Sequence, residues 1–237
     1  MDIKDVIARR TDLSTFLIHL TRDADPTPAR SRLEQILANW TLAARSPYGA
    51  AARRLTDAGQ NTDSQRCACF TESPLEHVYW LLPEIDNREI QFRPFGVALP
   101  KKEGRRLGIN PVWYVDTTPG HDWITNPINA LIDEAIHAGA FPGSHIARIA
   151  PFVEQMGTWP GNRKEFWWER EWRHVGDLVL PDKIIVLCPE ADFVHFQNIV
   201  TQNQPPVRSG KFIDPHWGLE QIIGRLAGYT ATDIEML

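Results

Sequence analysis

The stretch EFWWEREWRH, residues 165–174, places charged side chains inside the most aromatic part of the chain. Tryptophan-rich segments favour burial, and a buried charge is costly unless it is paired or used in a site. Read as a β-strand, the stretch presents its side chains alternately on two faces. One face then carries Phe166, Trp168, Arg170, Trp172 and His174, and the other carries Trp167, Glu169, Glu171, Arg173 and Val175. The stretch is therefore either a salt-bridged core strand or the wall of a site.

The row of charges on the second face allows two interpretations. Glu169 and Glu171 repel each other, so a cation or a ligand must compensate their charge. In the structural interpretation Arg173 is that cation. In the functional interpretation a carboxylate is held where positive charge develops during a reaction. A helix would instead pair Glu169 with Arg173 at i,i+4, but the aromatic content and the β-rich run that follows favour a strand.

Length, charge and composition restrict the class of protein. The chain has 237 residues and a mass of 27.0 kDa, and we expect a single domain, residues 1–237, with a substantial core. The net charge of −5 argues against general binding to nucleic acid or to a membrane surface. No run approaches the roughly 20 apolar residues of a membrane span, and the N-terminus lacks a signal-peptide core. We therefore expect a cytoplasmic protein with no membrane partner.

The three cysteines are few and irregularly spaced. Cys67 and Cys69 fall in an apparent strand, and we expect their thiols to point to opposite faces. The sequence therefore predicts neither a disulfide nor a metal site at this pair, and we expect structural free thiols. No phosphate-binding, dinucleotide-binding, zinc-protease or serine-hydrolase motif occurs in the chain.

Strand and helix patterns follow one another without a regular βαβ rhythm. This order predicts an α+β fold with a mixed, largely antiparallel sheet and flanking helices. Predicted strands cover 16–23, 66–73, 92–101, 110–117 and parts of 170–189, and predicted helices cover 27–44, 74–85, 127–139 and 217–227. Thr27 is the expected N-cap of the first helix, with Pro28 at its first position. We expect 46–65 to be rich in loops, and 92–101 and 110–117 to be candidates for adjacent strands.

Two further segments carry candidate site residues. In FLIHLTRD, His19 and Thr21 share one face of an otherwise apolar strand, which suits a ligand-facing surface; hydrogen bonding to neighbouring loops is the alternative. In CACFTESPL, Thr71 and Glu72 follow a buried strand at the start of a predicted helix. A threonine there can cap the helix, and a carboxylate can interact favourably with the positive end of the helix dipole. Both residues therefore also have structural interpretations.

The order of segments between residues 15 and 190 resembles a known family. FLIHLTRD…LEQIL, CACFTESPLEHV, FRPFGVAL.K…NPVWYV and FWWEREWR follow one another as in the bacterial AbiGi-type abortive-infection family. They also resemble a related domain of unknown function with a CFS/T strand and an E-x-EWR strand. Because AbiGi is the antitoxin partner of a toxin–antitoxin pair, the resemblance implies antiphage defence and a toxin or antitoxin partner protein.

A second set of residues resembles the ADP-ribosyltransferases, including the DarT-like enzymes. These have a His or Arg in the first strand, a Ser/Thr or Tyr in a middle strand and a late Glu-x-Glu. His19 or Arg22, Thr71 and Glu169-Arg170-Glu171 occur here in that order, although CFTES departs from the usual Ser-Thr-Ser. The resemblance implies an ADP-ribosyltransferase-like core with NAD as the substrate. A carboxylate would stabilise the oxocarbenium-like ribose that forms when nicotinamide leaves.

The resemblance also implies roles for individual residues. Glu171 would serve bond cleavage, Glu169 would orient a protein or nucleic-acid acceptor, and His19 would complete the catalytic set. The implied NAD-binding residues are His19, Thr21, Tyr48, Phe70, Thr71 and Arg173, with Tyr48 or Phe70 stacking on nicotinamide. One alternative is a non-catalytic antitoxin or interaction module with a tryptophan-rich core strand. Another is a metal-dependent hydrolase that uses Glu72, Glu169 and Glu171.

Overall fold

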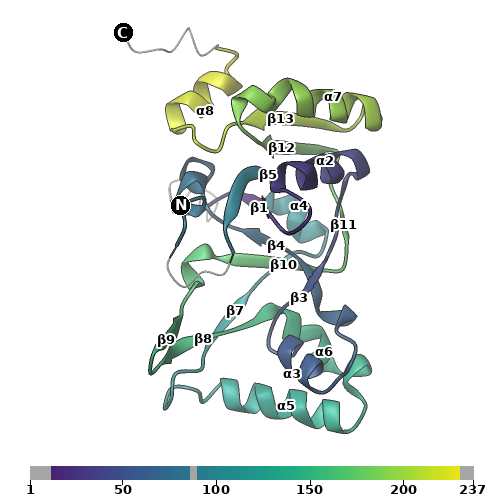
Figure 1. Ribbon diagram of the computed structural model, residues 1–237, viewed down its shortest axis with the longest axis vertical. Coiled ribbons are helices and arrows are strands. Elements are labelled where there is room, and N and C mark those ends of the chain that lie inside the picture. The colour runs from purple at the N-terminus through teal and green to yellow at the C-terminus, as the bar shows by residue number, and fades with distance from the viewer. Residues whose placement is uncertain (1–11, 86–89, 230–237) are drawn as a thin grey trace, which may run out of the picture. The chain divides into compact units, whose positions relative to one another are not determined.

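The computed structural model describes residues 12–85 and 90–229 (Figure 1). As predicted, the fold is a mixed α+β fold with a largely antiparallel sheet and flanking helices. The chain groups into two compact units, each built from separated segments: unit 1 draws on 1–41, 72–103 and 180–237, and unit 2 on 42–71 and 104–179. No helix in the described part of the chain is long and apolar enough to cross a membrane. The single domain over 1–237 stays a prediction.

Unit 1 contains four strands in the order β13 (Ser209–Ile213), β12 (Lys183–Leu187), β5 (Phe92–Pro100) and β1 (Phe16–Arg22). β12 and β13 are parallel, whereas β5 is antiparallel to both β12 and β1. Because β5 has a strand on each side, it is continuously apolar at its centre. The prediction that 92–101 and 110–117 are adjacent strands is therefore wrong, since both edges of β5 are taken.

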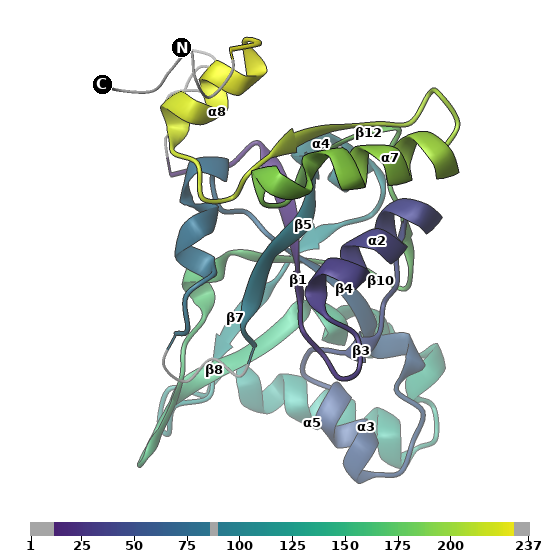
Figure 2. The same ribbon diagram turned by 45° about the horizontal axis from the view of Figure 1, so that its top comes forward.

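Helices α2 (Ala29–Asn39) and α7 (Phe193–Asn203) lie side by side in unit 1 (Figure 2). The predicted N-cap of α2 is wrong by one residue: Pro28 is the N-cap and the helix begins at Ala29. Proline offers no side-chain acceptor, and the carboxylate of Asp23 instead accepts a hydrogen bond from the Ala29 amide at 2.9 Å. The helix ends at Trp40, which has a left-handed backbone conformation.

Unit 2 contains two groups of paired strands. In the first, β4 (Arg66–Thr71) pairs antiparallel with β3 (Ser46–Pro47) and with β10 (Glu171–Val175), and β10 pairs with β6 (Asn110–Pro111). In the second, β8 (Val153–Trp159) lies between parallel β7 (Trp113–Asp116) and antiparallel β9 (Asn162–Lys164). The helices of this unit are α3 (Ala52–Asp57), α5 (Thr125–His137) and α6 (His145–Ile149).

The helices of unit 2 share an apolar core with β7 and β8. Residues 46–65, expected to be loop, contain α3, because Leu55 provides a buried anchor in an otherwise polar run. Gly49 precedes α3 with a φ of +86°, and a Cβ at this position would lie 2.0 Å from the Ala150 carbonyl oxygen. Only glycine allows this approach, which brings the Ala50 amide within 3.1 Å of the same oxygen.

Shorter elements complete the described chain. They are β2 (Thr41–Leu42), α4 (Lys101–Arg106), β11 (Leu178–Val179), α8 (Leu219–Leu226) and the 3₁₀ helices η1 (Asp63–Gln65), η2 (Leu75–Leu81), η3 (Phe141–Gly143), η4 (Ala150–Phe152), η5 (Trp167–Glu169) and η6 (Glu190–Asp192). The predicted helix over 74–85 is thus the 3₁₀ helix η2, and the predicted helix over 217–227 is α8.

The stretch 165–174 is not one continuous strand. Trp167–Glu169 form η5, Arg170 has a φ of +49°, and β10 begins only at Glu171. Two backbone hydrogen bonds close the turn, from Glu169 N to Phe166 O at 3.0 Å and from Arg170 N to Trp167 O at 3.2 Å. The predicted strand face is therefore wrong before Glu171, and Glu169 does not stand in a strand row with Glu171 and Arg173.

Candidate functional site

The candidate site lies on one face of the β4–β10 pair in unit 2. Glu171 stands opposite Thr71, and Arg173 stands opposite Cys69. Since side chains alternate along a strand, these four residues share one face of the pair. The other face carries Phe70 opposite Trp172, and Phe70 is buried. Phe70, predicted to stack on nicotinamide, is thus on the opposite face from Glu171.

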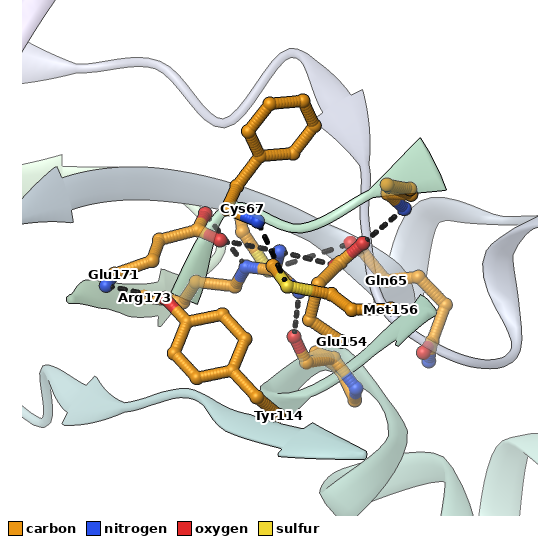
Figure 3. A network of polar contacts seen from close by, with 10 residues as sticks. Gln65, Cys67, Tyr114, Glu154, Met156, Glu171 and Arg173 are labelled. Atoms are coloured by element: carbon orange, nitrogen blue, oxygen red, sulfur yellow. Dashed lines mark hydrogen bonds and ion pairs between the residues drawn. The ribbon is translucent and has the colours of Figure 1, made fainter. Parts of the chain in front are cut away.

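Arg173 is the centre of a polar network on this face (Figure 3). Its side chain is 1% exposed. Nε and Nη2 donate to the two carboxylate oxygens of Glu171 at 2.9 and 2.7 Å, Nη2 also donates to Glu154 at 2.6 Å, and Nη1 donates to the Pro151 carbonyl oxygen at 2.7 Å. The guanidinium carbon lies 5.1 Å from the centre of the Tyr48 ring. Arg173 is therefore bound by protein groups, in a bidentate pair with Glu171.

The network is extended by a second cation. Lys164 Nζ donates to Glu154 Oε1 at 2.6 Å, so Glu154 joins Arg173 to Lys164. Burial by itself raises the pKa of Glu154, but the charges of Arg173 and Lys164 outweigh it and hold that pKa below its ordinary value. Burial likewise lowers the pKa of Arg173, and the carboxylate of Glu171 raises it well above its ordinary value. Two carboxylates thus face two cations.

The side chain of Glu171 remains partly exposed within this network. It is 18% exposed, in contrast to that of Arg173. The backbone on either side of it is fixed: the Glu171 amide donates to the Tyr114 hydroxyl oxygen at 2.7 Å, and the Glu171 carbonyl accepts from the Val112 amide at 2.9 Å. The first residue of β10 is therefore held at its main chain and at its side chain.

The turn before β10 is fixed to β4 and exposes aromatic side chains. The Thr71 hydroxyl donates to the Glu169 carbonyl oxygen at 2.5 Å. Trp167 is 61% exposed and Trp168 is 37% exposed. Thr71 and Glu169, both predicted site residues, are thus brought together, by a hydrogen bond from the Thr71 side chain to the Glu169 main chain.

Cys67 and Cys69 lie on the same face as Arg173, so the prediction that their thiols point to opposite faces is wrong. Residues two apart in a strand share a face, and the register places Arg173 opposite Cys69. Burial raises the pKa of Cys67 to about 12 and raises the pKa of Cys69 well above its ordinary value. Both are free cysteines, as expected.

The remaining predicted residues belong to unit 1. His19 is half-buried in the middle of β1. Thr21 is buried, and its hydroxyl oxygen lies 3.0 Å from the carbonyl oxygens of Ala29 and Phe95. Glu72 is buried and accepts a hydrogen bond from Lys101 at 2.6 Å. The described contacts of Thr21 and Glu72 are thus with protein groups, whereas Tyr48, Thr71, Glu169, Glu171 and Arg173 belong together in unit 2.

Four residues of the site were not predicted from the sequence: Tyr114, Pro151, Glu154 and Lys164. Pro151 contributes a backbone carbonyl, which no side-chain pattern indicates. Glu154 is the one carboxylate in the largely apolar run APFVEQM, and Tyr114 is the one hydroxyl in NPVWYV. A polar group among apolar side chains is the signal that would have found both.

Within the described ranges, no group of three or more His, Cys, Asp and Glu side chains has an arrangement that could hold a metal ion. Comparisons with protein-family models, with curated proteins and with solved structures give no match to this chain.

Proposed function

We propose that the protein acts in antiphage defence by abortive infection and cleaves NAD, with transfer of ADP-ribose to an acceptor or to water. The observation that supports this proposal is Glu171, whose side chain is partly exposed and whose carboxylate is oriented by two hydrogen bonds from a buried arginine. An ADP-ribosyltransferase-like core is part of the same proposal.

The geometry suits a carboxylate that stabilises a developing cation. An ionised carboxylate has about four acceptor positions, and Arg173 uses two of those on Glu171. The Cys69 thiol also has a hydrogen bond with this carboxylate. In this proposal a ribose hydroxyl donates to a position that Arg173 and Cys69 leave. As the bond from the ribose carbon to nicotinamide breaks, its electron pair neutralises the nicotinamide ring and positive charge develops on the ribose. A carboxylate that is already oriented stabilises this charge without reorganisation.

The acceptor then completes the reaction. Its nucleophilic oxygen or nitrogen forms the new bond to the ribose carbon and loses its proton, so that nicotinamide and an ADP-ribosyl product result. In this proposal Glu169 and the exposed aromatic side chains of the preceding turn meet the acceptor, and Tyr48 lies beneath Arg173. Arg173 then orients Glu171 rather than contacting NAD. His19 remains a proposed catalytic residue.

The non-catalytic alternative is favoured by a different observation. The charges of Glu171 and Glu154 are matched by Arg173 and Lys164, so the network is complete without a ligand. Trp167 and Trp168 are exposed beside it, and exposed tryptophans are typical of interaction surfaces. In this alternative the protein is an antitoxin or interaction module that binds a partner protein through this turn.

Incubation with adenylate-labelled NAD and cell lysate tests the proposal. The enzyme hypothesis predicts labelled product or free ADP-ribose from the wild type and none from Glu171→Gln. Glu154→Gln is the matched control, because it also deprives Arg173 of one of its two carboxylate partners but leaves Glu171 in place. Activity of Glu154→Gln should follow its stability alone. Absence of any NAD turnover by the wild type would instead favour the interaction module.

A further inference from the structure

The hydroxyl of Tyr114 lies at the main chain of Glu171. The Glu171 amide donates to its oxygen at 2.7 Å, and among the described residues this is the only hydrogen bond of the Tyr114 hydroxyl. The phenol acts there as the acceptor. A hydroxyl has one proton of its own to donate, so the O–H of Tyr114 is directed to a group other than the Glu171 amide.

The phenol stays protonated at neutral pH. Burial raises the pKa of Tyr114, and the nearby carboxylates of Glu171 and Glu169 raise it further, since a phenolate beside them would add a third negative charge. The ring is half-buried in β7, where Tyr114 stands opposite Glu154 in the parallel register with β8. The position of the hydroxyl is therefore fixed by β7 and by the Glu171 amide.

We infer that Tyr114 is a substrate-binding residue of the candidate site, and that its hydroxyl donates a hydrogen bond to a hydroxyl oxygen of the ribose that Glu171 also binds. Tyr114 presents a neutral donor beside a carboxylate that accepts. A vicinal diol offers the complement, because one hydroxyl can donate to Glu171 while its neighbour accepts from Tyr114. This inference rests on the proposed NAD cleavage and adds the group that recognises the sugar.

The test compares Tyr114→Phe with the wild type on NAD and on analogues that lack one hydroxyl of the nicotinamide ribose. Tyr114→Phe keeps the ring and removes only the hydroxyl. We expect kcat/KM for NAD to fall about tenfold, the usual effect of losing one hydrogen bond to a substrate. With the analogue that lacks the hydroxyl bound by Tyr114, the wild type and the variant should be equal. Tyr79→Phe, which makes the same change on a ring in η2 of unit 1, should match the wild type on every substrate.

The outcomes separate the inference from the function it rests on. Equal losses on NAD and on both deoxy analogues would assign Tyr114 a purely structural role and overturn the inference, while leaving NAD cleavage intact. Unchanged kinetics of Tyr114→Phe on NAD would overturn it as well. A wild type that neither cleaves NAD nor binds it by tryptophan fluorescence titration would overturn the proposed function, and the inference with it.

Discussion

Replacement of Arg173 by methionine removes the cation at the centre of the network and keeps most of the side-chain volume. In the wild type the guanidinium makes three hydrogen bonds to carboxylate oxygens and one to the Pro151 carbonyl. After the change, Glu154 keeps Lys164 as its partner, whereas Glu171 loses the cation that binds both of its oxygens. The carboxylates of Glu154 and Glu171 then repel each other, because the cation that bridged them is gone.

The magnitude follows from these contacts. Hydrogen bonds to charged groups contribute about 1.5–3 kcal/mol each, so three of them amount to roughly 5–9 kcal/mol before compensation. The buried methionine regains about 1.5–3 kcal/mol by burying apolar surface. The difference, about 2–7 kcal/mol, spans the roughly 3–5 kcal/mol that removal of one partner of a buried ion pair costs, and we expect a loss in this narrower range. At a urea slope of about 2 kcal/mol/M, the unfolding midpoint should fall by about 2 M.

The loss should also depend on pH, with a definite sign. The pKa of Glu154 is lowered in the folded protein from the ordinary value of 4.5. The stability that its ionisation contributes is therefore fully present above pH 4.5 and is lost as the pH falls through the folded pKa. Because Arg173 supplies much of that contribution, the difference between the wild type and Arg173→Met should be largest at neutral pH and should shrink below about pH 4.

Urea unfolding followed by tryptophan fluorescence measures both effects. Arg163→Met is the matched control, since Arg163 is an exposed arginine of β9 paired with Glu165; its effect should stay within about 0.5 kcal/mol. If Arg173→Met lowers the midpoint at pH 7 no more than Arg163→Met does, or if the difference grows in acid, the network does not stabilise unit 2 as described.

Three further predictions concern single sites. The three free thiols should react very slowly with a thiol reagent at pH 8, because burial raises the pKa of Cys67 and of Cys188 to about 12 and that of Cys69 well above its ordinary value; rapid labelling before urea is added would contradict their burial. Thr71→Val should cost about 1 kcal/mol, since it removes the donor to the Glu169 carbonyl, and Thr158→Val, at an exposed position, should cost less in the same urea titration. Gly96→Ala should destabilise unit 1 by about 1–3 kcal/mol, because its Cβ would lie 2.2 Å from the His19 carbonyl oxygen; Gly143→Ala, with open space around it, should be neutral, and equal melting temperatures of the two variants would refute the close approach.

Much of the fold follows from local patterns. The strands β1, β4 and β5 and the helices α2 and α5 coincide with periodic apolar runs bounded by Pro, Gly or polar residues. The pairing of these elements could not be predicted in the same way. β5 follows β4 along the chain, yet it pairs with β1 and with β12, which lies 83 positions further along if counted from Pro100 to Lys183. Such pairings depend on contacts between distant segments, which single-sequence periodicity does not contain.

The site was predicted in part for the same reason. The ion pair of Glu171 and Arg173 lies two residues apart on one strand, so strand alternation was enough to find it. The partners of Arg173 from other elements, Glu154 and the Pro151 carbonyl, come from separate segments. The turn at Arg170 was missed because EFWWEREWRH contains neither Gly nor Pro, the residues that usually mark a left-handed position.

Arg170 separates an exposed tryptophan from a buried arginine. Hydropathy alone would predict the opposite exposure for each of them. Before it, Trp167 is 61% exposed; after it, Arg173 is 1% exposed. Each placement costs free energy, because a large apolar surface stays in water and a cation leaves it. Trp167 and Arg173 lie six positions apart, on either side of Arg170, a non-glycine residue in a left-handed conformation. Several local rules broken together are typical of functional sites. This concentration of unfavourable placements around Arg170 supports the proposal of a site at Glu171 and its neighbours.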